Sequence, residues 1–217
     1  MAQYADDFPK GQIVTDVGSL KGEICAAAEK LLAPRGVRFV GSHPMAGTEK
    51  HGVGAAFPQL YENADIFILN GGGADPEAVE AVGSLWRCAG GHPKYLNDAN
   101  DHDALVARTS HVLHIVASAL TSGILDAASA EEKSKRFAGC ATGFRDSCRI
   151  AASTPAMWRE ITEKNRTAVL KAMDEFEERY FTLRRLIEEG EFDRFQEEFA
   201  KGKELRDQWM SYKNNRS

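Results

Sequence analysis

The sequence predicts an α/β region with a largely parallel sheet, followed by an all-α region. Up to about residue 97, short β-branched runs alternate with helical patterns, which is typical of consecutive βα units. From residue 98 onward no strand-like run follows, and apolar residues recur at the spacing of long amphipathic helices. We therefore expect two domains, at residues 1–97 and 98–217.

Four short segments have the β-branched and apolar composition of strands. They are residues 12–16, 37–41, 64–69 and 93–96. A doubly wound sheet normally has about six strands, so this sheet is expected to be incomplete. The chain also contains no G-x-G-x-x-G, the usual dinucleotide fingerprint. The first half is therefore interpreted as the back portion of a larger α/β domain.

Two helices are expected between these strands. Ser19 is placed to cap the first helix, which ends near residues 34–36 (PRG). The second helix begins at Pro76 and is expected to present one apolar face, made of Val79, Val82 and Leu85.

The second half contains only helical patterns. Residues 104–128 predict one long apolar helix, and Pro155 stands at the first position of another. An apolar stripe over residues 169–187 ends at Gly190, and phenylalanines from Phe192 onward continue on a final charged helix. Such helices more often pack in a bundle or a dimer than carry chemistry.

Composition excludes several classes of protein. The chain is 43% hydrophobic and 27% charged, which is globular rather than disordered, and its net charge of −5 gives no footprint for nucleic acid. No apolar run approaches the ~20 residues of a membrane span, and the first residues lack a signal-peptide core. The four cysteines form no CxxC pair and are expected to be small buried hydrophobes. A cytoplasmic protein is the expectation.

The densest polar cluster covers residues 41–50 (GSHPMAGTEK) and directly follows a predicted strand. Ligand sites of open α/β sheets lie beyond the carboxyl ends of strands, so His43 is well placed to act as a general base. Thr48 and Glu49 are candidates to orient the imidazole or a substrate. The alternative is a loop histidine that only bonds the backbone.

A second strand-to-helix turn, residues 16–21, carries Gly18 and Ser19. A hydroxyl and the N–H groups of a helix N-terminus can bind a ligand there. Local sequence alone favours simple capping by Ser19.

Two further clusters lie in the helical half. His111 and His114 are three residues apart and share a helix face, as polar lining of a cleft or as core histidines. They lack the partners of a convincing metal site, so no metal is expected. Arg149 stands close in sequence to Trp158 and suits a small carboxylate, although a surface ion pair with Asp146 or Glu160 is the simpler interpretation.

Taken together, these clusters resemble the prephenate dehydrogenase family (cyclohexadienyl dehydrogenases of tyrosine biosynthesis). The matching strings are TDVGSLK at 15–21, FVGSHPMAGTEK at 39–50, SHVLH at 110–114, FRDSCRIA at 144–151 and PAMWR at 155–159. The resemblance runs from Ile13 to at least Ile187. Leu113 departs from the proline usual in the family. The glycine fingerprint that opens the family's nucleotide-binding half has no counterpart here, so the chain is expected to be truncated at its front.

The resemblance implies a Rossmann-like domain followed by a helical domain that forms a homodimer. It implies oxidative decarboxylation of prephenate or arogenate, with NAD or NADP as cofactor, giving 4-hydroxyphenylpyruvate or tyrosine. His43 matches the catalytic base and Ser19 a residue beside both the base and the nicotinamide. The positions that match the family's substrate-binding residues are Arg149, His114, His111, Thr48, Glu49 and Trp158. Those that match its cofactor-binding residues are Gly18, Ser19 and Pro44.

Two other interpretations remain open at this point. The chain could be a non-catalytic dimeric remnant of that family that binds a ligand or a partner chain, because the pyrophosphate cradle is missing. A metal hydrolase that uses His43, His111 and His114 is disfavoured, because a carboxylate-rich ligand set is lacking.

Overall fold

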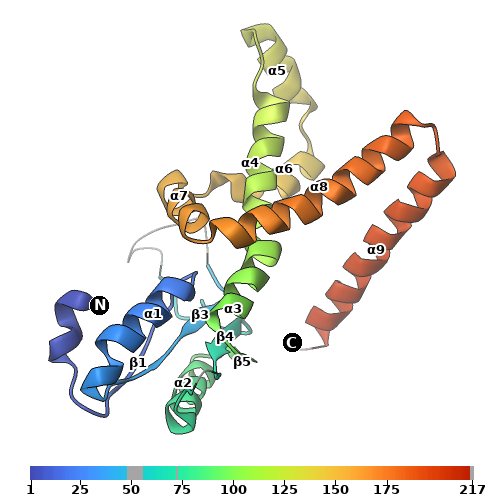
Figure 1. The fold of residues 1–217 in the computed structure, drawn as a ribbon. Helices are drawn as coiled ribbons and strands as arrows, with labels where there is room; N and C mark the ends of the chain where they lie inside the picture. Colours follow the sequence, from blue (N-terminus) through green and yellow to red (C-terminus); the bar gives the residue numbers. More distant parts are fainter. Residues whose placement is uncertain (48–55, 72, 216–217) are drawn as a thin grey trace. The chain divides into compact units, whose positions relative to one another are not determined.

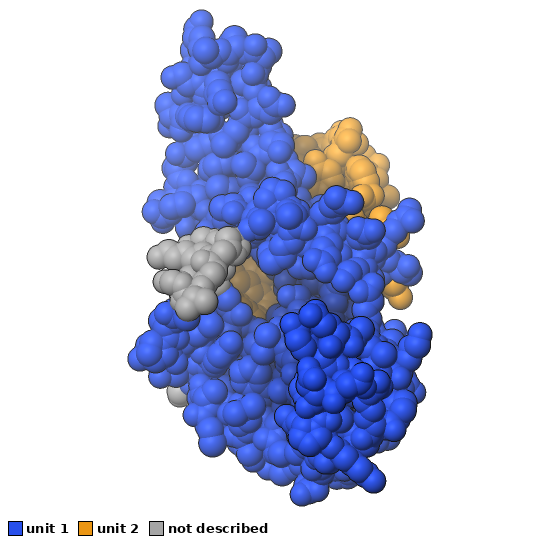
Figure 2. Space-filling view, turned by 90° about the vertical axis from the view of Figure 1, so that its left-hand side faces the viewer, with its two compact units in different colours: residues 1–169 blue, residues 170–217 orange. Residues whose placement is uncertain are grey.

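A computed structural model describes residues 1–47, 56–71 and 73–215 of the chain (Figure 1). The chain divides into two compact units, Met1–Val169 and Leu170–Ser217, which are coloured separately in Figure 2. The first unit contains every described strand and helices α1 to α7. The second contains most of α8 and all of α9.

Five short strands lie among the described residues of the first unit. They are β1 (Ile13–Thr15), β2 (Arg38–Val40), β3 (Ser42–Pro44), β4 (Asp65–Leu69) and β5 (His92–Leu96). The pairs β1–β2 and β4–β5 are parallel, which confirms the α/β expectation. The pair β3–β4 is antiparallel, so the three-stranded sheet β3-β4-β5 is mixed, whereas β1 and β2 form a separate parallel pair. The chain passes from β2 to β3 through Gly41 alone, so its direction does not reverse there.

Helix α2 (Pro76–Cys88) covers a core that contains Val40, Ile66 and Ile68 from the strands. Asp75 caps this helix by accepting hydrogen bonds from two backbone N–H groups. The expected apolar face is partly wrong, because Leu85 is 56% exposed whereas Trp86 is buried. The indole N–H of Trp86 donates to Ser42 Oγ at 3.0 Å, which ties the helix to β3.

Helix α1 (Gly22–Leu31) begins differently from the prediction. Ser19 makes no cap, and Lys21 occupies the N-cap position without a side-chain cap bond. The carboxylate of Asp103, 81 residues further along from Gly22, accepts the backbone N–H groups of Lys21 and Gly22, each at 2.9 Å. A cap supplied from a distant helix leaves no local sequence signal, and it leaves the Ser19 hydroxyl free of a capping role.

The next helical stretch runs from Ala99 to Leu125. It consists of α3 (Ala99–Val106), a π-helical segment η4 (Ala107–His111) and α4 (Val112–Leu125), so it starts and ends earlier than predicted. By length and composition it is apolar enough to cross a membrane, contrary to the sequence expectation, although core helices of soluble proteins also pass this test. Within the stretch His102 and His111 are buried.

The first half also contains two short 3-10 helices, η1 (Ala2–Asp7) and η2 (Ala33–Arg35). The remaining described helices agree with the predicted all-α half. They are α5 (Ala130–Gly139), α6 (Thr142–Cys148), η5 (Arg149–Ala152), α7 (Pro155–Lys164), α8 (Arg166–Glu188) and α9 (Phe192–Asn214). Pro155 stands at the start of α7 as predicted. Gly190 separates α8 from α9 with φ of 70°, a left-handed conformation that favours glycine.

Candidate active site

A cavity of about 320 Å³ in the first unit brings together residues from all four of the sequence clusters. Its lining includes the predicted site residues Ser19, His43, Pro44, His111, His114, Arg149 and Trp158. These residues come from the loop after β1, from β3, from the η4–α4 junction and from the η5 and α7 segments. Thr48 and Glu49, also predicted here, lie outside the described residues.

The sequence suggested that His43 lies in a loop after a strand, but the structure places it within strand β3. It pairs in register with Phe67 of β4, and its neighbours Ser42 and Pro44 are buried. The sequence signal failed because a three-residue strand ending in proline has a poor strand propensity. The ladder with β4 fixes the backbone of His43, so the imidazole is presented from a rigid element.

His43 bonds to a second, fully buried histidine that no sequence cluster assigned to the site. His43 Nδ1 lies 2.9 Å from His102 Nε2, and His102 Nδ1 lies 2.7 Å from Asp103 Oδ1. The pKa of His43 is lowered to about 3, mainly by burial; protonation of His102 and the nearby Lys21 ammonium act in the same direction. His43 is therefore neutral at physiological pH. A histidine and an aspartate adjacent in sequence on α3 are the signal that could have pointed to this pair.

Beneath the site lies a buried ion pair. Lys21 is fully buried, and its ammonium pairs with Asp16 and donates to the carbonyl of Ser42 at 2.8 Å. The Asp16 carboxylate also accepts the backbone N–H groups of Ser42 and Gly18, at 3.1 and 2.8 Å. One ion pair therefore fixes the loop that carries Ser19 against the strand that carries His43.

The histidines of the helical half form an aromatic wall with Trp158. The ring of His114 stacks on the indole at 4.0 Å between centroids, and the ring of His111 meets it edge-on at 5.7 Å. Asn165 Nδ2 donates to the carbonyl of Asp103 at 2.8 Å and lies 3.3 Å from His111 Nδ1. Burial lowers the pKa of His111 to about 4.

Arg149 lines the cavity and is otherwise exposed. The alternative, an ion pair of Arg149 with Asp146 or Glu160, does not describe the structure, because Asp146 pairs with Arg145 at 3.3 Å and Glu160 pairs with Lys164 at 2.7 Å. The described residues contain no group of three or more His, Cys, Asp or Glu side chains that could hold a metal ion.

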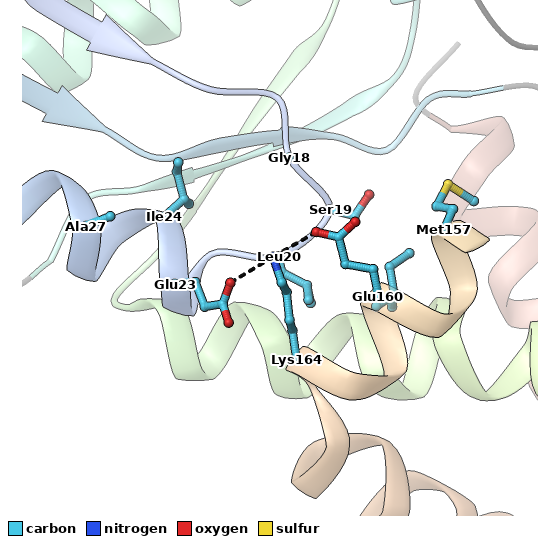
Figure 3. Close-up of a pocket in the computed structure, with 10 residues that line it drawn as sticks. Gly18, Ser19, Leu20, Glu23, Ile24, Ala27, Met157, Glu160 and Lys164 are labelled. Carbon is cyan, nitrogen blue, oxygen red and sulfur yellow. Dashed lines mark hydrogen bonds and ion pairs between the residues drawn. The ribbon is translucent and has the colours of Figure 1, made fainter. Parts of the chain in front are cut away.

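A neighbouring cavity of about 400 Å³ lies between α1 and α7, and Ser19 and Met157 line both cavities (Figure 3). Its walls include Gly18, Ile24 and Ala27 on the α1 side. On the other side Lys164 pairs with Glu23 at 2.8 Å and with Glu160 at 2.7 Å, close to the cavity rim. The predicted cofactor residues are thus divided, with Gly18 in this cavity, Pro44 in the first and Ser19 in both.

In a comparison with known protein families, two consecutive parts of the chain match two domains of one family. "Prephenate dehydrogenase, nucleotide-binding domain" matches residues 1–95, and "Prephenate dehydrogenase, dimerization domain" matches residues 98–201. The chain belongs to the prephenate dehydrogenase family. The match confirms the resemblance inferred from the site strings and agrees with the mixed sheet followed by helices.

Individual relatives agree with this membership. A prephenate dehydrogenase of Bacillus subtilis is 36% identical over 195 residues, covering 90% of this chain and 52% of that protein. The crystal structure of Aquifex aeolicus prephenate dehydrogenase in complex with hydroxyphenyl propionate and NAD+ is 32% identical, with a TM-score of 0.85 over 95% of this chain and 70% of that one. Synechocystis arogenate dehydrogenase is 26% identical, with a TM-score of 0.78 over 91% and 69%. The chain spans about half the length of the curated relatives it matches.

Proposed function

We propose that this chain carries the substrate site of an NAD-dependent dehydrogenase that decarboxylates prephenate or arogenate as it oxidises it. The observation that carries the proposal is the 320 Å³ cavity, where a neutral His43 and an exposed Arg149 line the same space as Ser19. A base for a hydroxyl and a cation for a carboxylate are the two groups that such a substrate requires.

His43 is the group that handles the proton. The ring hydroxyl of the substrate must lose its proton as hydride leaves the same carbon, and a neutral imidazole accepts it. The ring carboxylate then leaves as CO2, its bonding electrons make the ring aromatic, and the proton returns to the new phenolic oxygen. Because aromatisation supplies the driving force, the protein needs mainly orientation and one base.

Arg149 is proposed to bind the side-chain carboxylate of the substrate. A guanidinium offers two parallel N–H donors to a carboxylate, which fixes orientation as well as position. The stacked His114 and Trp158 supply a flat wall beside it, suited to a six-membered ring. Both prephenate and arogenate present this carboxylate, and they differ at the adjacent keto or amino group.

The cofactor proposed is NAD, or NADP in its place, and it accepts the hydride when bound. Gly18, Ser19 and Pro44 are the residues of this chain that would hold its nicotinamide end. Ser19 fits this role because it makes no cap and lines the wall shared by the two cavities. The chain offers no G-x-G-x-x-G for the pyrophosphate, so its own residues account for only one end of the cofactor.

We further propose that the chain forms a homodimer through its helical half, in the cytoplasm. The description of the matched family model as a dimerization domain supports this. Helices α8 and α9 also leave many large apolar side chains exposed, a pattern that marks association surfaces. They are Leu170, Phe176, Tyr180, Phe181, Ile187, Phe192, Phe199, Leu205, Trp209 and Tyr212.

The second candidate is a non-catalytic remnant that binds the ligand without turning it over. The lack of a G-x-G-x-x-G in these 217 residues favours it, because that motif holds the pyrophosphate of a dinucleotide. Such a chain would bind prephenate saturably and would form no NADH.

NADH formation by the purified chain, with prephenate and then arogenate, tests the proposal. We expect turnover with one of them, and we expect His43→Asn to abolish it while the circular dichroism spectrum stays native. Arg149→Ala should raise KM strongly, whereas Arg145→Ala, an exposed arginine outside the cavity, should leave KM unchanged. Near-wild-type turnover in His43→Asn, or equal effects of the two arginine variants, would refute the assigned roles. Saturable binding without NADH would establish the remnant.

A further inference from the structure

A continuous chain of hydrogen bonds leads from the N-terminus of α1 to the proposed base. The Asp103 carboxylate accepts the backbone N–H groups of Lys21 and Gly22 and contacts His102 Nδ1 at 2.7 Å. His102 in turn contacts His43 Nδ1 at 2.9 Å. His102 is fully buried, and the side chain of Asp103 is 16% exposed, so water has little access to either bond.

Each contact in this chain has a fixed direction once the carboxylate is ionised. Burial raises the pKa of Asp103, but hydrogen bonds from His102 and from the Lys21 and Gly22 backbone outweigh it, and the net pKa is lowered. An ionised carboxylate only accepts, so His102 Nδ1 must carry the proton that it donates. When neither histidine is charged, Nε2 of His102 is an acceptor, so His43 Nδ1 donates to it.

We infer that His102 and Asp103 are positioning residues that hold His43 as its Nδ1–H tautomer, so that its Nε2 keeps a lone pair for a substrate hydroxyl. The use of this lone pair in catalysis rests on the proposed function, whereas the tautomer itself does not. The opposite tautomer would place a proton on Nε2, and the imidazole could then only donate to the hydroxyl.

The neighbouring His111 provides a contrast within the same molecule. Asn165 donates through Nδ2 to the backbone carbonyl of Asp103, which can only accept, so this amide is oriented with its N–H₂ group toward both partners. His111 Nδ1 must therefore accept, and its proton lies on Nε2. Two histidines that line one cavity are thus expected to hold opposite tautomers.

The test is a 15N NMR spectrum of the whole chain labelled on its histidine rings, recorded at neutral pH without ligand. His43 and His111 are assigned from the signals lost in His43→Asn and His111→Asn. We expect a protonated, pyrrole-type nitrogen at Nδ1 of His43 and at Nε2 of His111. A proton on Nε2 of His43 in the wild-type spectrum would overturn the inference without any variant of His102.

Two variants of His102 separate a positioning role from simple packing. His102→Phe keeps a ring against Phe67 but removes the acceptor, whereas the amide of His102→Gln reaches as far as Nε2 and keeps one. We expect His43 to become a tautomer mixture in His102→Phe and to stay Nδ1–H in His102→Gln. An unchanged His43 in His102→Phe would overturn the inference.

Activity gives an independent readout. His102→Phe should lower kcat about 10- to 100-fold with little change in KM, the size of effect usual for a residue that orients a reacting histidine, and His102→Gln should recover much of it. A change in KM alone would contradict positioning of the base. If the wild-type chain forms no NADH, the proposed function fails, but the ring spectra still decide the tautomer.

Discussion

Lowering the pH from about 7 to about 5 should destabilise the fold through His43. Its folded pKa is about 3, mainly because burial disfavours the imidazolium, whereas an unfolded histidine titrates near 6.5. Between these two values the unfolded chain binds a proton that the folded chain does not. The free energy of unfolding therefore falls as the pH drops below 6.5. Linkage between the two pKa values gives a loss of about 2 kcal/mol at a pH of about 5 for this group.

Urea unfolding of the wild type and of His43→Asn at both pH values isolates this contribution. His111, whose pKa is also lowered, titrates in both proteins, so its effect cancels in the comparison. We expect the wild type to lose about 2 kcal/mol more than the variant on acidification. Equal losses in the two proteins would refute the reasoning, because His43 would then titrate alike in the folded and unfolded chains.

Two further predictions concern buried groups around the site. Lys21→Met should lower the free energy of unfolding by about 3–5 kcal/mol because it strands the Asp16 carboxylate, and adding Asp16→Asn should recover part of this loss in urea unfolding. Fully additive losses in the double variant would argue against the pairing. Burial raises the pKa of the Cys25 thiol to about 11, so Cys25 should react with a thiol reagent at mildly alkaline pH far more slowly than the exposed Cys88. Similar rates in a mass-spectrometric time course would contradict the burial of Cys25.

Much of the fold could be predicted because its signals are local. The proline at the start of α7, the glycine between α8 and α9 and the β-branched run of β4 each specify their element within a few residues. The sequence-based predictions were wrong where a contact with a distant residue determines the local structure. The start of α1 depends on Asp103 rather than on Ser19, and β3 forms because β4 pairs with it.

The candidate site also divides into residues with a local sequence signal and residues that only a distant contact brings in. The strings around His43, His111 and Arg149 were sufficient to predict which side chains meet, and one cavity contains all three. The sequence assigned no role to His102 and Asp103, because their role depends on α3 lying against the N-terminus of α1 and against β3, which no spacing along the chain reveals. Buried partners that act through another side chain are the part of a site that local sequence describes least.

The most direct test of the central claim is the ratio of CO2 to NADH released from prephenate labelled with 14C in its ring carboxylate. If His43 and Arg149 serve one coupled oxidation and decarboxylation, the purified chain should release the two products in equal amounts, and both should vanish together in His43→Asn. NADH without labelled CO2, or an equal ratio that persists in His43→Asn, would contradict the account.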